Sequence, residues 1–295
     1  MTDQRPIILW AHARSLSTVF ERPFLQLRQE FHVIHEPFVP IGLAYQANNF
    51  EFLDNIQPPK PTDPITFAHH LTPTLNEILK PRYYNGDETK PLRAFVKDLA
   101  ITFYHASQGN QLQSKEILLK FKHTFLIRNP EKSIKSYYRA ANDTYKAWDE
   151  ADVPDSKRIE IFSADHIGIK ELRAIYDLIK NVTEEEIALV DADDLVREPE
   201  KVLRKYCEMV GVEFRKEMLT WKAEKIKRWD LKLTDMHHEP DLYNIWHRNA
   251  SQSTGFNSVS HVSHEKEIEY PRYVYDIIAE NVPHYEYLRQ HKINV

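Results

Sequence analysis

The chain has 295 residues, 42% of them hydrophobic and 28% charged, a balance typical of a globular protein with one large α/β domain or two small ones. Its formal net charge of −5 argues against a general nucleic-acid partner, which would require a broadly basic surface. The single cysteine, Cys207, excludes a disulfide framework and indicates a reducing compartment, so we expect a cytoplasmic location.

The first predicted element is a buried strand, residues 7–10, that leads into a helix. Its uninterrupted apolar run is typical of a strand in a parallel sheet, and it is too short for a signal sequence or a membrane span. Ser15, Ser17 and Thr18 are residue types that begin helices, and the N–H groups at a helix start bind anions. Arg14 could fork onto phosphate or sulfate oxygens. An ordinary strand-to-helix connection would look the same, and the glycine-rich Walker pattern is absent.

A second strand is predicted at residues 31–34 and ends just before Glu36. A carboxylate at a strand exit lies on the rim where α/β sheets hold their ligands, although a surface or helix-capping acid is the alternative. Residues 39–91 are rich in aromatics and proline. We expect them to form an irregular helical insertion over the sheet edge and to act as a lid over an acceptor.

The third and fourth predicted strands also end in polar residues. Residues 92–96 are followed by Lys97 and Asp98 and then by a helix that carries His105. Residues 124–127 form the fourth strand.

The helix after the fourth strand begins at Pro130, a residue that favours the first helical turn. Arg128 lies just ahead of this helix, and Ser136 lies two turns into it. The two side chains could hold one phosphate from two sides.

The remaining pattern completes an α/β fold. A helix at residues 167–181, a strand at 187–190 and a helix at 198–210 follow, the last stopped by Gly211. Strands alternating with helices predict a central parallel sheet flanked by helices on both faces. We expect residues 213–295 to be helical and loop-like and the whole chain, residues 1–295, to form one domain.

The C-terminal part also contains a histidine-rich stretch and a polar loop. The histidine spacings fit no zinc pattern, so we expect no metal site. Residues 249–260 are rich in Ser, Thr and Asn around Gly255, and we expect a loop that could close over a ligand.

Two anion-binding junctions at this separation resemble those of the sulfotransferases that use 3′-phosphoadenosine 5′-phosphosulfate (PAPS). The loop of residues 14–18, Arg-Ser-Leu-Ser-Thr, resembles the family's 5′-phosphosulfate loop. Arg128 in Arg-Asn-Pro, with Ser136 eight residues later and two tyrosines after it, resembles the family's 3′-phosphate motif. The resemblance covers about residues 6–212 and implies a P-loop NTPase-like sulfotransferase fold. It implies PAPS as co-substrate, 3′-phosphoadenosine 5′-phosphate (PAP) as product, and donor binding by Arg14, Ser15, Leu16, Ser17, Thr18, Arg128 and Ser136.

The sequence departs from the family pattern at two positions. Leu16 replaces the usual loop glycine, and Leu99 stands where the cytosolic steroid and phenol enzymes carry a catalytic histidine. Other family members use a glutamate after the second strand, which implies Glu36 as the first-choice base. Asp98 is the second choice and His105 the third.

The resemblance also implies how the reaction is assisted and what it modifies. Arg14 and Lys97 would stabilise the departing PAP, so no metal is required. We expect transfer of a sulfuryl group to a hydroxyl or amine of a polar small molecule. The acids Glu36, Asp98, Glu51 and Asp54 would suit a cationic acceptor, for example a secondary metabolite of the saxitoxin-like alkaloid kind. A catalytically silent nucleotide-binding protein and a P-loop-type kinase are the alternatives. The acceptor and the oligomeric state, for example a homodimer, stay open.

Overall fold

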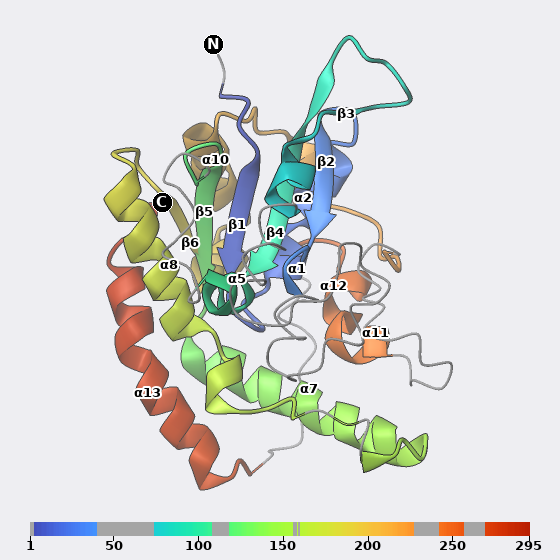
Figure 1. Cartoon of the computed structure of the whole chain (residues 1–295), viewed down its shortest axis with the longest axis vertical. Coiled ribbons are helices and arrows are strands. Elements are labelled where there is room, and N and C mark those ends of the chain that lie inside the picture. The colour runs from blue at the N-terminus through green and yellow to red at the C-terminus, as the bar shows by residue number, and fades with distance from the viewer. Residues whose placement is uncertain are drawn as a thin grey trace.

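The computed structural model describes residues 3–39, 74–107, 118–155, 158, 160–226, 242–256 and 269–295. Its centre is a sheet with the strand order β2-β4-β1-β5-β6, in which every neighbouring pair along this path is parallel (Figure 1). The predicted fold class, α/β with a central parallel sheet flanked by helices, is confirmed. The strands are β1 (Ile7–Ala11), β2 (Phe31–His35), β4 (Pro91–Leu99), β5 (Lys122–Ile127) and β6 (Ala188–Asp191), and the short β3 (Arg82–Tyr83) pairs antiparallel with β4.

Strand β1 lies in the middle of the sheet and is buried along its whole length. Its side chains alternate between two hydrophobic cores, one on each face. Ile8 and Trp10 belong to the first core, and Ile7 and Leu9 belong to the second. This alternation explains the uninterrupted apolar run, because a strand buried on both faces has no solvent side for polar residues.

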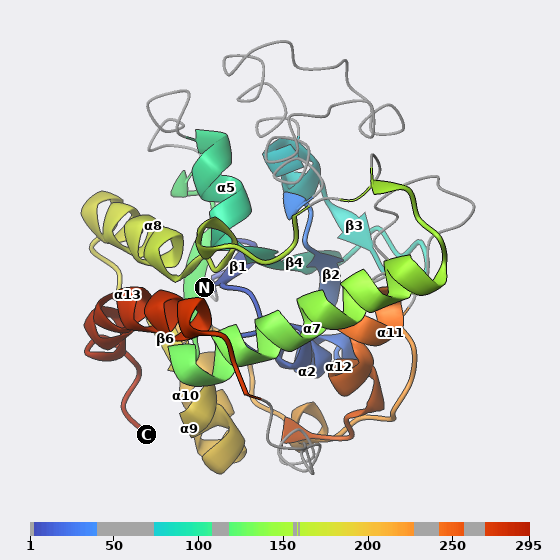
Figure 2. The same cartoon turned by 90° about the horizontal axis from the view of Figure 1, so that it is seen from below.

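Helices cover both faces of the sheet (Figure 2). Several helices contribute buried side chains to each core. On the first face lie α5 (Ala100–Ser107), α8 (Ile169–Val182) and α13 (Arg272–Arg289), and on the second lie α1 (Ser17–Phe20), α2 (Arg22–Gln26), α9 (Ala192–Arg197) and α10 (Pro199–Val210). As predicted, α10 ends at Gly211, which adopts the left-handed backbone of a helix stop.

Helix α7 (Pro130–Glu150) lies across the carboxyl ends of the strands (Figure 1). The side chain of Asn129 caps it by accepting a hydrogen bond from the N–H of Glu131 at 2.9 Å, and Pro130 occupies the first turn. The short helices α11 (Leu242–Trp246) and α12 (Arg248–Gln252) follow, and α11 contacts α7. The edge where parallel strands end, which is the usual ligand edge of an α/β sheet, is therefore enclosed by helices.

The structure corrects the predicted end of the third strand. Strand β4 continues to Leu99, so Lys97 and Asp98 lie inside it rather than after it. At Lys97 the strand is paired on both sides, with His35 of β2 and Leu9 of β1. Because β4 is hydrogen-bonded to a strand on each side, it stays extended through the charged residues Lys97 and Asp98.

Four further predictions agree with the structure in part. The first helix is divided into α1 and α2, with a proline in the first turn of α2. The predicted lid spans residues 39–91, of which residues 40–73 lie outside the described residues. The described part of this segment contains β3, a strand that the sequence did not predict. Within 213–295 the described segments are helices and irregular chain joined by one isolated bridge, Thr220 to Gly255. Of the predicted loop 249–260, the first residues belong to α12 and residues 257–260 are not described.

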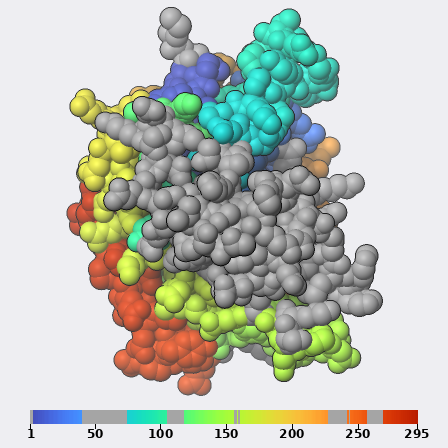
Figure 3. All heavy atoms as spheres, viewed as in Figure 1, coloured from blue at the N-terminus to red at the C-terminus, as the bar shows by residue number. Residues whose placement is uncertain are grey.

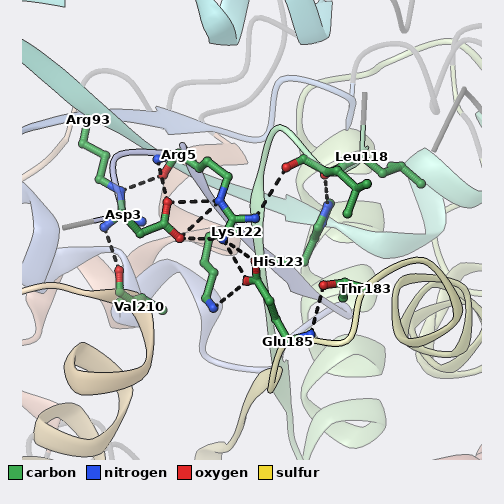
Figure 4. Close-up of polar contacts among 10 residues, drawn as sticks. Asp3, Arg5, Arg93, Leu118, Lys122, His123, Thr183, Glu185 and Val210 are labelled. Carbon is green, nitrogen blue, oxygen red and sulfur yellow. Dashed lines mark hydrogen bonds and ion pairs between the residues drawn. The ribbon is translucent and has the colours of Figure 1, made fainter. Parts of the chain in front are cut away.

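The amino ends of the strands are tied together by a charge network (Figure 4). Arg5 donates to Asp3 at 2.6 Å and to Glu185 at 2.8 Å, and Lys122 donates to Glu185 at 2.9 Å. Arg93 joins them to α10 by donating to the carbonyl of Val210 at 2.7 Å. The turn beside β3 projects from this same end of the molecule (Figures 1 and 3). The network therefore stabilises the end of the sheet that is remote from α7.

Candidate functional site

A cavity of about 750 Å³ opens at the carboxyl end of the sheet, between the loop after β1, one face of α7, helix α9 and helices α11 and α12. This size is typical of small-molecule and cofactor sites. Six of the seven residues predicted to bind the donor line it: Arg14, Leu16, Ser17, Thr18, Arg128 and Ser136. The seventh, Ser15, is fully buried.

The loop after β1 bends through two left-handed residues. Arg14 has φ 60° and Leu16 has φ 70°, and the N–H of Ser15 between them donates to the carbonyl of His12 at 3.3 Å. Glycine adopts this backbone freely, whereas a leucine does so at a cost of about 1–2 kcal/mol. Leu16 therefore adopts this left-handed bend under strain.

The two predicted junctions meet in space. Nε of Arg14, from the first junction, donates to Oγ of Ser136 in α7 at 3.1 Å. Nη1 of Arg128, from the second junction, donates to the carbonyl of Arg14 at 2.9 Å. Nη1 of Arg14 also donates to the carbonyl of Trp246 in α11 at 2.7 Å. The guanidinium of Arg14 thus joins α7 to α11, while Arg128 binds the backbone of the same residue.

The cavity is strongly cationic. Its basic residues are Arg14, Arg128, Lys132, Lys135, Arg139 and Arg197, and its acidic residues are Glu131 and Asp193. The acids are engaged by lysines, Asp193 with Lys132 at 2.9 Å and Glu131 with Lys135. Among the described residues, neither Arg14 nor Arg128 forms an ion pair with a carboxylate. Two arginines without a counter-charge favour an anionic ligand here.

Burial, with repulsion from neighbouring arginines, lowers the pKa of both Arg14 and Arg128. For Arg14, burial is the main cause, followed by the charges of Arg128 and Arg139, and its pKa falls to about 10. Burial likewise lowers the pKa of Arg128. A bound anion would relieve both effects because it replaces lost hydration with a charge of opposite sign.

Two buried polar atoms at the junctions have no hydrogen-bond partner among the described residues. They are Oγ of Ser15 and Nε of Arg128. Buried donors are nearly always satisfied, so an unpaired one points to a missing partner. A phosphate or phosphosulfate group supplies acceptor oxygens of the right kind, so the residues present fit a nucleotide with anionic groups at both ends.

Glu36 lies directly after β2 in a left-handed conformation with φ 47°. Its N–H donates to the carbonyl of Lys97 at 2.7 Å, and its carboxylate forms a buried ion pair with the ammonium of Lys97. Burial alone would raise the pKa of Glu36, but the charges of Lys97 and His35 and the nearby His247 outweigh burial and hold that pKa at about 2. Glu36 is therefore ionised at neutral pH.

Two histidines complete this cluster. Nδ1 of His35 lies 2.6 Å from a carboxylate oxygen of Glu21, and its Nε2 lies 3.7 Å from Glu36. The ring of His247 lies edge-on to that of His35, with centroids 5.5 Å apart. Burial lowers the pKa of His247 to about 3, so this ring is neutral. Because His247 follows Trp246, a cavity residue, the Glu36 cluster adjoins the cavity although Glu36 and Lys97 do not line it.

The other two candidate bases differ from Glu36 in their surroundings. Asp98 is fully buried and accepts hydrogen bonds from the N–H of Phe38 at 2.6 Å and of Leu99 at 2.7 Å. Burial, with the charge of Glu36, raises the pKa of Asp98 to about 8. His105 belongs to α5, and its side chain lies outside the described part of the structure. Of the three, Glu36 is the one that forms an ion pair with a lysine.

Several residues of this site had no signal in the sequence. His12, Glu21 and Trp246 stand in ordinary apolar or charged surroundings, and only the fold brings them to the junctions. His247 is one of several C-terminal histidines whose spacing fits no zinc pattern, and His35 is the residue before Glu36. In the described part of the chain no group of three or more histidine, cysteine or acidic side chains is arranged to hold a metal ion. No helix in that part is both long and apolar enough to cross a membrane.

No protein-family model matches the chain. The chain is 26% identical over 301 residues to branched-chain-amino-acid aminotransferase-like protein 1 of Arabidopsis thaliana, which covers 99% of the chain and 43% of that protein. It is also 27% identical over 285 residues to branched-chain-amino-acid aminotransferase-like protein 2 of the same plant. This match covers 96% of the chain and 41% of that protein. The chain thus spans less than half the length of each of these two relatives.

Two solved structures are similar to the chain. One is the sulfotransferase domain from the Synechococcus PCC 7002 olefin synthase, at 16% identity and a TM-score of 0.43, covering 93% of each chain. The other is the sulfotransferase domain from the curacin biosynthetic pathway, at 13% identity and a TM-score of 0.38, covering 95% of this chain and 98% of that one. The sequence identity and the TM-score are low for both structures. The chemistry of the site is therefore inferred from its own side chains.

Proposed function

We propose that the chain is a PAPS-dependent sulfotransferase with the P-loop NTPase-like sulfotransferase fold. The observation that carries the proposal is the meeting of Arg14 and Arg128 in one cavity. Each comes from its own strand-to-helix junction, and neither is paired with a carboxylate of the described residues. A nucleotide with a single anionic end needs one such junction. Two junctions suit a donor with a phosphosulfate at one end and a phosphate at the other.

The residues divide between the two ends of the donor. The loop from Arg14 to Thr18 would hold the 5′-phosphosulfate, with the unpartnered Ser15 hydroxyl available to it. Arg128 and Ser136 would hold the 3′-phosphate, and the free Nε of Arg128 is the donor that this phosphate would satisfy. The Arg14–Ser136 hydrogen bond brings the two sets together.

The reaction assigned to this site is transfer of one sulfuryl group. A lone pair of the acceptor oxygen or nitrogen attacks sulfur, the bond from sulfur to the bridging phosphate oxygen breaks, and PAP leaves with that electron pair. Glu36, held ionised by Lys97, would take the proton of the acceptor. Arg14 would offset the negative charge that develops on the bridging oxygen. Lys97 would contribute to the same effect if its ammonium moved away from Glu36.

We propose a polar small molecule with a hydroxyl or amine as acceptor. Glu36 is paired with Lys97, and Asp98 binds backbone N–H groups, so neither carboxylate is available to hold a cationic acceptor such as an alkaloid. Glu51 and Asp54, the other acids considered for that role, lie outside the described residues.

Isothermal titration calorimetry with PAP, ADP and 5′-AMP tests the donor site, and mass spectrometry of a small-molecule extract incubated with PAPS tests transfer. We expect PAP to bind more tightly than either nucleotide lacking the 3′-phosphate, and products heavier by one SO₃ group. Equal affinities would reject the donor site. Tight PAP binding without any sulfated product would identify a silent nucleotide-binding protein, and magnesium-dependent ATP turnover a kinase.

A further inference from the structure

His12 lies between the two junctions and is not accounted for by either. It follows β1 directly, and none of its surface is exposed to solvent. Its Nδ1 lies 3.0 Å from the carbonyl oxygen of Ala13, and its Nε2 lies 3.1 Å from the backbone nitrogen of Arg128. One imidazole ring therefore joins the end of β1 to the end of β5.

The two contacts allow a single tautomer. The N–H of Arg128 must donate, so Nε2 carries no proton, and the carbonyl of Ala13 must accept, so Nδ1 carries one. Burial, partly offset by the Ala13 carbonyl, lowers the pKa of His12 to about 3. The neutral ring with a fixed tautomer is thus the form present across the physiological range.

The N-terminus of α8 lies beside His12. The N-cap of α8 is Gly168, which has φ 83°, and a Cβ at that position would lie 3.3 Å from Cβ of Ile101 and 3.7 Å from Cβ of His12. His12 is therefore packed against a third segment of the chain besides the ends of β1 and β5.

The His12 link differs in kind from the other link between the junctions. Arg128 also donates from Nη1 to the carbonyl of Arg14, but that bond uses the guanidinium that a phosphate would engage. The His12 bond uses the backbone N–H of Arg128, so it persists whatever the guanidinium does.

We infer that His12 is a positioning residue that fixes the distance between the loop after β1 and the start of α7, and with it the distance between the two groups that hold the ends of the donor nucleotide. The inference rests on the proposed function, because only a ligand held at both ends depends on this distance. A ligand held at one end does not.

A matched pair of variants separates the two contacts of the ring. In His12→Gln the longer amide reaches the Arg128 N–H but not the Ala13 carbonyl. In His12→Asn the shorter amide reaches the Ala13 carbonyl but not Arg128. Calorimetry measures the Kd of PAP, 5′-AMP and 3′-AMP for the full chain and both variants.

We expect His12→Asn to weaken PAP binding about tenfold, equivalent to one buried hydrogen bond, while the Kd of each singly phosphorylated nucleotide changes less than about twofold. His12→Gln should retain the preference for PAP to within about threefold. Hydrogen exchange adds a readout without ligand: the Arg128 amide should exchange faster in His12→Asn than in His12→Gln.

The outcomes distinguish failure of this inference from failure of the donor site. If the unaltered chain shows no preference for PAP over 5′-AMP, the donor site is wrong and the role of His12 falls with it. If the unaltered chain prefers PAP but both variants keep that preference, or lose affinity for all three nucleotides equally, the inference alone is overturned. Should His12→Asn fail to fold, His12→Gln decides: a lost preference for PAP refutes the inference, as does a retained preference with fast exchange of the Arg128 amide, whereas a retained preference with slow exchange supports it.

Discussion

Nε of Arg14 donates a hydrogen bond to Oγ of Ser136, 3.1 Å away, across a separation of 122 residues in the chain. The bond joins the loop after β1 to the second turn of α7, the two places where the sequence indicates anion binding. The site is therefore assembled before any ligand arrives. Preorganisation of this kind favours binding because the groups need not be ordered at that moment.

Replacing Arg128 by alanine should weaken PAP binding far more than 5′-AMP binding. The guanidinium has a buried, unpartnered Nε that a 3′-phosphate would engage, and a charge-assisted hydrogen bond of this kind contributes about 1.5–3 kcal/mol, or roughly tenfold to a hundredfold in Kd. Calorimetry gives both constants. Arg204→Ala, on the exposed side of α10 and paired with Glu200, is the control and should change neither. Similar losses for PAP and 5′-AMP would contradict the assignment of Arg128.

Replacing Glu36 by glutamine should lower turnover by about 10²–10⁴ while PAP still binds, because the amide cannot take the acceptor's proton. The ammonium of Lys97 is then left buried without a counter-charge, which costs about 3–5 kcal/mol of the free energy of unfolding. Steady-state kinetics and urea unfolding measure the two effects.

The double variant Glu36→Gln with Lys97→Met separates stability from catalysis. It removes the uncompensated charge, so stability should return while turnover stays low. If Glu36→Gln turns over nearly as fast as the unaltered chain, Glu36 is not the base and Asp98 or His105 takes its place as the candidate.

The free energy of unfolding should fall as the pH is lowered from about 6.5 to about 4, in part because of His123. Its Nδ1 accepts from the indole N–H of Trp10 at 3.0 Å, and its Nε2 lies 2.9 Å from the Leu118 carbonyl, so the neutral ring is required. Burial lowers the pKa of His123 to about 4. Between these values the unfolded chain binds a proton that the folded chain does not, so stability is present at higher pH and is lost on acidification.

His123→Gln isolates this contribution because its side chain does not titrate. Urea unfolding at several pH values should show a shallower dependence in the variant, by up to about 1.4 kcal/mol per pH unit. His12 and His247 keep their share in both proteins, since burial lowers the pKa of each to about 3. Parallel curves for the two proteins would show that His123 is not held neutral.

Substitutions at Leu16 should rank by their tolerance of a left-handed backbone rather than by hydrophobicity. Leu16 has φ 70° and ψ 17°. Asparagine tolerates this region, whereas a β-branched residue there is a steric outlier. We expect Leu16→Val to be less stable than Leu16→Asn by about 1 kcal/mol or more, although valine is the better match for the apolar neighbours. Urea unfolding measures the difference, and a valine variant as stable as the asparagine variant would show that the loop relaxes.

The parts of the fold that could be predicted are those written locally in the sequence. Uninterrupted apolar runs predicted β1 and β6, because strands buried on both faces leave little room for polar residues. Pro130 and Gly211 marked a helix start and a helix stop through their own backbone preferences. Arg14, Arg128 and Ser136 followed from the residue types that flank such boundaries.

The parts that could not be predicted depend on residues far apart in the chain. The continuation of β4 through Lys97 arises from pairing with both β1 and β2, and nothing near Lys97 records it. The place of His12 beside Arg128 and of His247 beside His35 depends on how the strands and α11 are arranged. The left-handed backbone at Leu16 is imposed by the loop against the preference of leucine.

The central place of β1 also bears on how the protein is made. On the ribosome this strand emerges well before either of its neighbours, β4 and β5, whose residues lie roughly a hundred positions further along the chain. Its pairing with both neighbours can be completed only after Ile127 has been synthesised. Folding that begins with such distant pairings is slow and exposes the nascent chain to aggregation, so a chaperone that holds the first segment would assist its synthesis.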